Sequence, residues 1–317
     1  MLRFFSQKTR SLALVVAAVV IAGGAAAPNQ PRAKPPTFSD ADRAAFFDDA
    51  FSMLVGDRPD FAAAAAAIAA TPSAGPGAGE ASDDDDYRWS RWISTDTLET
   101  EIKRQAQSVA AVVRSSTSFK GGGYLDARDA FSTLAVMFAV SAAHDEDARW
   151  ADRAKSLAAL IARAGANCKV GTDNSFREAS ARSEDLAELV RGGRPDTPAA
   201  SEEDDWSTLA DRAPLMRRLD AALFEQLGPL TANERAFERG AEDALHQAEV
   251  LAALSEVLTF EGFIDAGDED YDAFARNLRD AAADIARAAD QEDYTPVREA
   301  FGRASKACNE CHELYRG

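Results

Sequence analysis

Two cysteines and a histidine stand within five consecutive residues near the end of the chain. They are Cys308, Cys311 and His312, in the run Cys-Asn-Glu-Cys-His. Residues three apart lie on one face of a helix, so each thiol can form a thioether with one vinyl group of the same haem. The histidine that follows can bring its imidazole to the iron as the proximal ligand. Cys-x-x-Cys-His is the attachment pattern of c-type haem, so the sequence predicts one covalently bound haem.

Other chemistries of paired cysteines fit this chain less well. A zinc site would need a second pair of ligands, but the third cysteine, Cys168, stands alone, and His144 and His246 do not show zinc-finger spacing. A thioredoxin-like redox pair belongs at the start of a helix in a βαβ unit, and the sequence shows no strand pattern. A disulfide across two residues within a helix would be strained. Haem attachment therefore remains the preferred interpretation.

The elements that must position this motif are helices. Residues 205–317 contain four amphipathic stretches with short connections, which predict an antiparallel four-helix bundle. A capping box at Thr231 and Glu234 is expected to open the second helix, and Thr295 with Pro296 the fourth. Both cysteines continue the apolar stripe of the fourth helix. The haem is therefore expected to face the interior of the bundle.

A second, looser set of four amphipathic stretches fills residues 87–193. Segments 144–164 and 267–288 resemble each other, which suggests that the two halves are copies, although the first half has no Cys-x-x-Cys-His motif. We therefore predict an all-α protein. In it, the haem-carrying four-helix bundle follows a second, degenerate helical bundle.

The order of these features resembles a known family. A four-helix chain that ends in Cys-x-x-Cys-His-x-x-Tyr-Arg is similar to the class II c-type cytochromes, of the cytochrome c-prime type. Some members of that family leave the sixth iron position open, and others fill it with a Met from an Arg-x-x-x-Met pattern on the first helix. This chain has Arg212 and Met216 at that spacing. The resemblance implies that Met216 is the distal ligand and that Arg212 lies near a haem propionate.

Two alternatives to Met216 remain open at this point. Met216 can be ordinary core filler on a helix stripe, which would leave the sixth position open. His246, on the second helix of the same bundle, is a rival distal ligand. Pro214 lies inside the Arg-x-x-x-Met pattern and can either start the helix there or kink it, which would shift Met216.

The beginning of the chain reads as an export signal followed by a tether. Residues 1–27 combine a positive start, a short apolar core and small residues suited to cleavage, which is typical of a signal peptide; an uncleaved anchor is the alternative. Residues 28–86 form a low-complexity linker rich in Pro, Ala and Asp. We therefore expect a periplasmic or otherwise extracytoplasmic protein whose mature chain has no transmembrane segment.

Charge and ligation together limit the function. A formal net charge of −18 disfavours nucleic acid and favours a redox partner protein with a basic surface. With both axial positions filled by the protein, the haem is expected to carry electrons. The alternatives are a five-coordinate haem that binds nitric oxide or carbon monoxide, and an acidic docking protein that tethers a haem domain. No catalytic arrangement of residues stands out, so an enzyme is not expected. The oligomeric state does not follow from the sequence.

Overall fold

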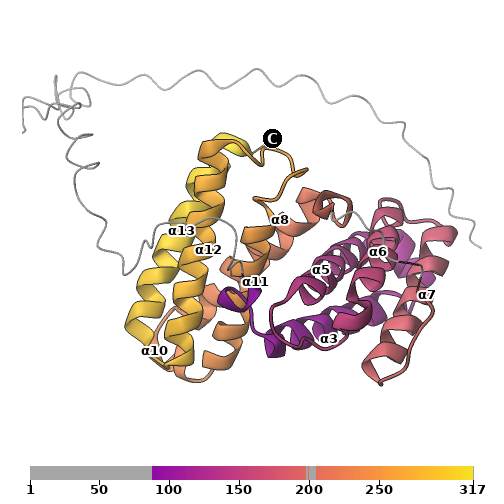
Figure 1. Ribbon diagram of the computed structural model, residues 1–317, viewed down its shortest axis with the longest axis horizontal. Helices are drawn as coiled ribbons and strands as arrows, with labels where there is room; N and C mark the ends of the chain where they lie inside the picture. The colour runs from indigo at the N-terminus through magenta and orange to yellow at the C-terminus, as the bar shows by residue number, and fades with distance from the viewer. Residues whose placement is uncertain (1–87, 198, 200–204, 317) are drawn as a thin grey trace, which may run out of the picture. The chain divides into compact units, whose positions relative to one another are not determined.

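The computed structural model describes residues 88–197, 199 and 205–316, which are coloured in Figure 1. The predicted signal peptide, 1–27, and the predicted linker, 28–86, lie outside the described residues. Helices and turns make up the described part of the chain, and no strand occurs in it. The all-α prediction is therefore confirmed.

Four long helices form the N-terminal bundle. They are α3 (Thr95–Val112), α5 (Tyr124–Ala143), α6 (Ala151–Asn167) and α7 (Asp173–Val190). Helix α5 is central, because it packs against both α3 and α6 and is buried around most of its circumference. Side-chain caps at Ser94 and Thr172 start α3 and α7, where each accepts a hydrogen bond from a backbone N–H of the first turn.

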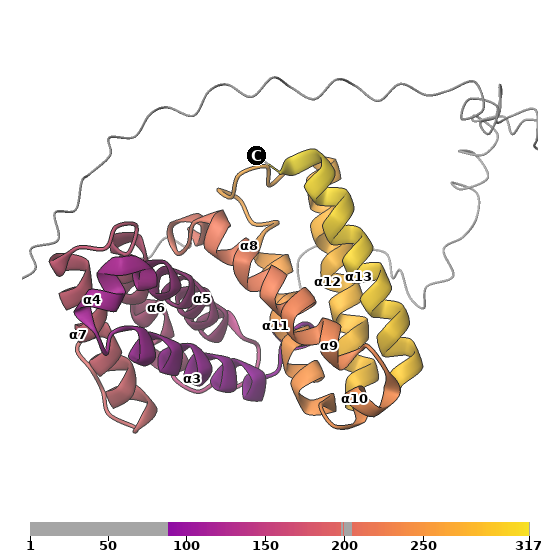
Figure 2. The ribbon, with the colours of Figure 1, turned by 180° about the vertical axis from the view of Figure 1, so that it is seen from behind.

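The C-terminal bundle is built on four main helices. Short α8 (Arg212–Asp220) is followed by α11 (Ala241–Val257), α12 (Glu269–Asp290) and α13 (Tyr294–Tyr315). Helix α12 packs against α11 on one side and α13 on the other, and the two longest helices run side by side in Figures 1 and 2. This arrangement agrees with the four-helix bundle that the sequence predicts for this region.

Two predicted helix starts are wrong. Thr231 does not cap the second helix of this bundle; its hydroxyl donates to the carbonyl of Gly228. Asn233 caps the short α10 (Glu234–Glu238), and α11 begins only after Gly240. At α13 the cap is Asp293 instead of Thr295. In both cases several Asx, Ser or Thr residues stand close together, and sequence alone does not rank them.

The helix that carries Met216 is short and irregular. Pro214 lies in the first turn of α8, where its missing N–H breaks no helical hydrogen bond, so α8 starts before the proline instead of being kinked by it. After Asp220 the chain continues as a π-helix, η5 (Ala221–Leu227), and then as α9 (Gly228–Leu230). The first helix of the bundle is thus assembled from three pieces.

All described residues fall in one compact unit. Within it, α8 packs against α5, and α11 packs against α3, so the first two helices of each bundle face those of the other. The division into domains at residues 87–193 and 205–317 stays a prediction. None of the helices in the described ranges is both long and apolar enough for a membrane span.

Candidate haem site

Helix α13 carries the three residues of the predicted attachment motif. Cys308, Cys311 and His312 lie in its last two turns, and each side chain is half-buried. The upstream turns of α13 are anchored by the buried Val297, whereas both cysteines pack against the edge of the hydrophobic core. The helix thus holds both thiols at the bundle interior while leaving one side of the motif open to solvent.

A narrow apolar cavity brings this motif together with Met216. Its lining comes from α8, α11 with the turn after it, α12 and α13. The lining residues are Met216, Leu219, Asp220, Leu258, Tyr271, Phe274, Ala275, Leu278, Ala307, Cys308, Cys311 and His312. Two thiols, an imidazole and a thioether therefore meet in one apolar space, which is the donor set that a haem with His and Met ligands requires.

Burial governs the chemistry of the two thiols. It raises the pKa of Cys308 to about 11, and the nearby Asp220 carboxylate acts in the same direction. The pKa of Cys311 is also raised by burial, although the Arg212 guanidinium opposes the shift. Both cysteines are thus protonated thiols at neutral pH. Such thiols are weak nucleophiles, which argues against a redox-active dithiol at this position.

Arg212 lies at the Cys311 end of the cavity and is paired with a carboxylate. Its Nη1 donates to Asp265 at 2.5 Å and to the Ile264 carbonyl at 3.4 Å. Tyr271 is 1% exposed, and no acceptor for its O–H lies within hydrogen-bond distance in the described part of the chain, although the Arg212 guanidinium interacts with its oxygen. Burial raises the pKa of Tyr271 to about 12 against the opposing charge of Arg212.

The fit to a haem rests on these donors and not on the space available, because the cavity has a volume of only about 30 Å³. A buried hydroxyl without a partner is costly, and a propionate carboxylate beside Arg212 would accept its hydrogen bond. The sequence did not predict a role for the Tyr271 hydroxyl. It placed Tyr271 only on the apolar stripe of the third helix of this bundle, together with Phe274 and Leu278, which also line the cavity.

His246 lies away from this cavity and is engaged in another contact. It is buried on α11, and its Nε2 lies 2.9 Å from Oε2 of Glu101 on α3. The structure therefore does not bring together His246 and the cysteine motif, and the distal candidate that remains at the cavity is Met216.

The other cysteine and histidine singled out by the sequence belong to the N-terminal bundle. Cys168 is buried at the end of α6, and burial raises its pKa to about 12. The His144 ring lies between two backbone groups: Nε2 is 2.9 Å from the Ile93 carbonyl, and Nδ1 accepts from the N–H of Glu146. Both contacts hold the turn between α5 and α6 in place.

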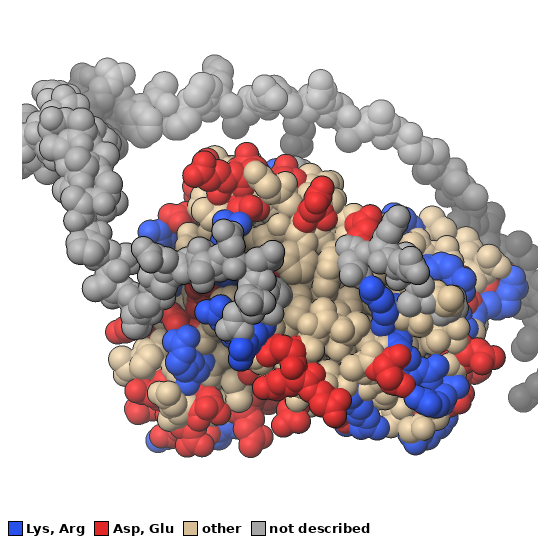
Figure 3. All heavy atoms as spheres, in the orientation of Figure 1, with Lys and Arg blue, Asp and Glu red and all other residues tan. Residues whose placement is uncertain are grey.

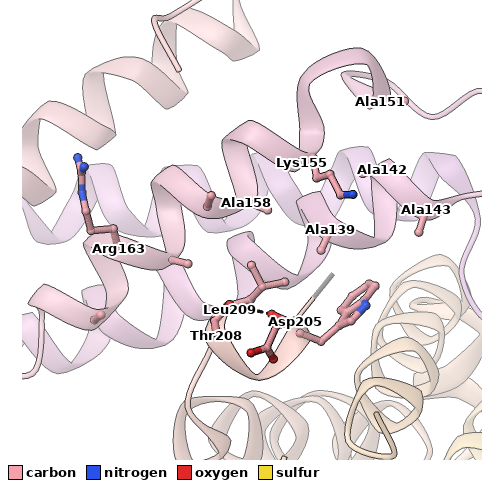
Figure 4. A pocket seen from close by; sticks show the side chains of 14 residues that line it. Ala139, Ala142, Ala143, Ala151, Lys155, Ala158, Arg163, Asp205, Thr208 and Leu209 are labelled. Atoms are coloured by element: carbon pink, nitrogen blue, oxygen red, sulfur yellow. Dashed lines mark hydrogen bonds between the residues drawn. The ribbon is translucent and has the colours of Figure 1, made fainter. Parts of the chain in front are cut away.

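A larger cavity, of 580 Å³, lies elsewhere, between α5, α6 and the segment 205–209. Figure 4 shows that alanines from α5 and α6 line it, with Lys155 and Arg163 extending from α6. It contains none of the predicted haem ligands. The comparison of the two cavities shows that size alone does not locate the chemistry of this protein.

Comparison with known proteins supports the assignment of the C-terminal bundle. Residues 209–316 match the family model described as Cytochrome C'. The match confirms the resemblance of this region to the class II, cytochrome c-prime type, and it implies a haem cofactor. It includes all five residues predicted for the site and leaves the N-terminal bundle unmatched. No match is found among curated proteins or among solved structures.

Proposed function

We propose that the chain is an electron carrier in which one haem is attached to Cys308 and Cys311 and held between His312 and Met216. The observation that carries the proposal is that Met216 and His312 line the same cavity, from α8 and α13. When bound, the haem supplies an iron that accepts and gives up one electron.

Each residue of the cavity has a separate task in this proposal. The two thiols fix the haem on α13, and His312 and Met216 provide the axial donors. The Met216 thioether is held inside the chain at high effective concentration, so it competes with diatomic ligands for the distal side. A thioether donor also favours the reduced state, which raises the reduction potential. The apolar lining keeps water from the part of the haem that faces the bundle interior.

Replacement of the thioether tests the proposal. In Met216→Leu we expect the sulfur-to-iron absorption band to disappear, the reduction potential to fall and carbon monoxide to bind the reduced protein rapidly. Met137→Leu is the matched control, because Met137 is fully buried in the N-terminal bundle and should leave the spectrum unchanged. If wild type and Met216→Leu both bind carbon monoxide at once, Met216 is not a ligand, and the protein is a five-coordinate gas-binding module.

Location and partner follow from the same proposal. Haem of the c type is attached outside the cytoplasm, so an extracytoplasmic protein is consistent with a signal peptide at residues 1–27. Acidic side chains gather over both ends of the C-terminal bundle in Figure 3. Together with the net charge of −18, this surface favours a redox partner that is basic where it docks.

A further inference from the structure

Helix α8 carries Met216 but has only nine residues. A helix of this length is marginal without tertiary contacts, and its continuation, η5, is a π-helix with a different hydrogen-bond pattern. Tertiary contacts must therefore fix the position of α8, and helix α5 of the N-terminal bundle packs against it. The contacts of the charged residues of α8 show which helices hold it in position.

The exposed side of α8 is bound to α5 of the N-terminal bundle. Arg217 makes two parallel hydrogen bonds to Asp129, from Nε at 2.7 Å and from Nη2 at 2.5 Å. Asp211, which precedes α8, pairs with Arg128 of the same helix α5 and lies 3.0 Å from Lys169 Nζ. A bidentate pair fixes direction as well as distance, because both N–H groups must meet both oxygens.

The inner side of α8 is bound to α3 through a buried charge. Arg218 Nε donates to Oε1 of Glu101 at 2.9 Å, and Arg218 Nη2 donates to Gln247 at 3.0 Å. Glu101 is 1% exposed, and its second oxygen lies 2.9 Å from His246 Nε2. Gln105 completes the set with a hydrogen bond to Oε1 at 2.8 Å. A buried carboxylate with this many partners has one well-defined position.

These contacts lie on the two residues that follow Met216. At 3.6 residues per turn, Arg217 and Arg218 point about 100° and about 200° round the helix from Met216. A rotation or shift of α8 that moves Met216 away from the cavity must therefore break the Asp129 pair, the Glu101 pair or both. The N-terminal bundle thus holds α8 through side chains on faces other than the one that carries Met216.

We propose that the haem-free N-terminal bundle positions the distal ligand. Asp129 and Glu101 are positioning residues: through Arg217 and Arg218 they hold α8 in the orientation that keeps Met216 at the haem cavity. The proposal rests on the proposed function, in which Met216 is that ligand. It gives the first bundle a role in tuning the haem.

The test compares three variants of the full-length, haem-loaded protein. Asp129→Asn removes the negative charge from the partly exposed Arg217–Asp129 ion pair. Glu101→Gln does the same in the buried Arg218–Glu101 ion pair. Asp243→Asn is the matched control, because Asp243 pairs with Arg104 at 2.8 Å and so also joins the two bundles, but from α11 instead of α8. Amide hydrogen exchange of residues 212–220 reports how firmly α8 is held. The intensity of the sulfur-to-iron band and the rate of carbon monoxide association report whether Met216 is bound to the iron.

We expect Asp129→Asn and Glu101→Gln to speed exchange in α8 by roughly tenfold, to weaken the band and to speed carbon monoxide binding, while Asp243→Asn matches the wild type. Unchanged α8 exchange in Asp129→Asn, or an equal change in the control, overturns the positioning role. Should Glu101→Gln fail to fold, Asp129→Asn alone decides. A wild-type protein without the band contradicts the proposed ligation instead, and α8 exchange still decides whether the N-terminal bundle holds this helix.

Discussion

The Tyr271 hydroxyl is buried in the lining of the cavity beside Arg212. The guanidinium interacts with its oxygen, but no acceptor for its O–H lies within hydrogen-bond distance in the described part of the chain. A buried polar group left without a partner costs about 1–3 kcal/mol. A haem propionate near Arg212 would remove that cost, because a carboxylate is a strong acceptor.

The substitution Tyr271→Phe measures this contact. In the haem-loaded protein we expect it to lower the free energy of unfolding by about 1 kcal/mol, because the hydroxyl loses its acceptor. In the haem-free double variant Cys308→Ala, Cys311→Ala, the same change should be neutral or stabilising. Urea denaturation of all four proteins gives the comparison. Equal effects with and without haem would show that the hydroxyl does not contact the cofactor.

Covalent attachment of the haem also depends on individual residues, Cys308 and Cys311. We expect the haem of the wild type to stay with the polypeptide during acid–acetone extraction, because thioether bonds survive it. Cys308→Ala should weaken and the double cysteine variant should abolish this retention. Cys168→Ser is the control: its thiol is buried at the end of α6, in the other bundle, and its replacement should leave the haem attached. Complete extraction from the wild type would refute covalent attachment.

The attachment motif could be recognised at this scale for a physical reason: the spacing of Cys308, Cys311 and His312 is local to one helix. Met216 and Arg212 were implied by the family resemblance alone. The structure places Met216 in the cavity with the motif, and its ligation stays a prediction. His246 could not be excluded from sequence, because its partner Glu101 stands 145 positions earlier in the chain. Tyr271 was missed as a polar group, since nothing local shows that a hydroxyl will lack an acceptor.

Among the helices, α3, α8 and α11 are joined by the buried carboxylate of Glu101. Burial pushes the pKa of Glu101 upward, but the hydrogen bond to His246 and the charge of Arg218 outweigh it and hold the pKa well below its ordinary value of 4.5. The folded protein therefore binds this proton more weakly than the unfolded chain does. The carboxylate stabilises the fold above about pH 4.5, and this contribution is lost as the pH falls below that value.

Glu101→Gln should change this pH dependence. At neutral pH we expect the variant to lose about 3–5 kcal/mol of unfolding free energy, because Arg218 then has no buried counter-ion. Between about pH 5 and about pH 3, the wild type should lose stability more steeply than the variant, by up to about 1.4 kcal/mol per pH unit. Urea denaturation at a series of pH values measures both slopes. Parallel slopes would mean that Glu101 is not the group responsible.

The sequence patterns are sufficient to predict which segments form helices, but not where each helix begins. The apolar stripes predict the long helices of both bundles, because period and burial are coupled in an amphipathic helix, but they do not show that the first helix of the C-terminal bundle is divided into α8, η5 and α9. Exact starts are less predictable: Asn233 caps a short helix where Thr231 was expected, since neighbouring polar residues compete for the same backbone groups. The π-helix η5 has no sequence signal that separates it from an ordinary helix.

The whole molecule is strongly acidic, and this determines how it should meet other proteins. With a net charge of −18, encounter with a basic partner is accelerated at low ionic strength and slowed when salt screens the charges. We expect the second-order rate of electron exchange with a small basic haem protein to fall by about tenfold between low and physiological salt. Stopped-flow mixing measures this rate. An acidic acceptor should show the opposite trend, and a flat salt dependence with both would contradict steering by charge.

The relation between the two bundles is the part least accessible from sequence. Ion pairs such as Arg217–Asp129 and Arg218–Glu101 join residues far apart in the chain, and nothing local to either partner indicates the other. The absence of a haem motif in residues 87–193 suggested a bundle that had lost its chemistry. The contacts of α8 with α3 and α5 are the basis on which we propose a positioning role for that bundle.

The absorption spectrum of the exported, haem-loaded wild type, oxidised and reduced, tests the central claim most directly. Ligation by His312 and Met216 predicts a low-spin iron in both states and, in the oxidised protein, a weak sulfur-to-iron band towards the red end of the visible spectrum. Reduced protein should bind carbon monoxide slowly. A high-spin spectrum with immediate carbon monoxide binding would contradict the account, because it would show that Met216 leaves the distal side of the haem open.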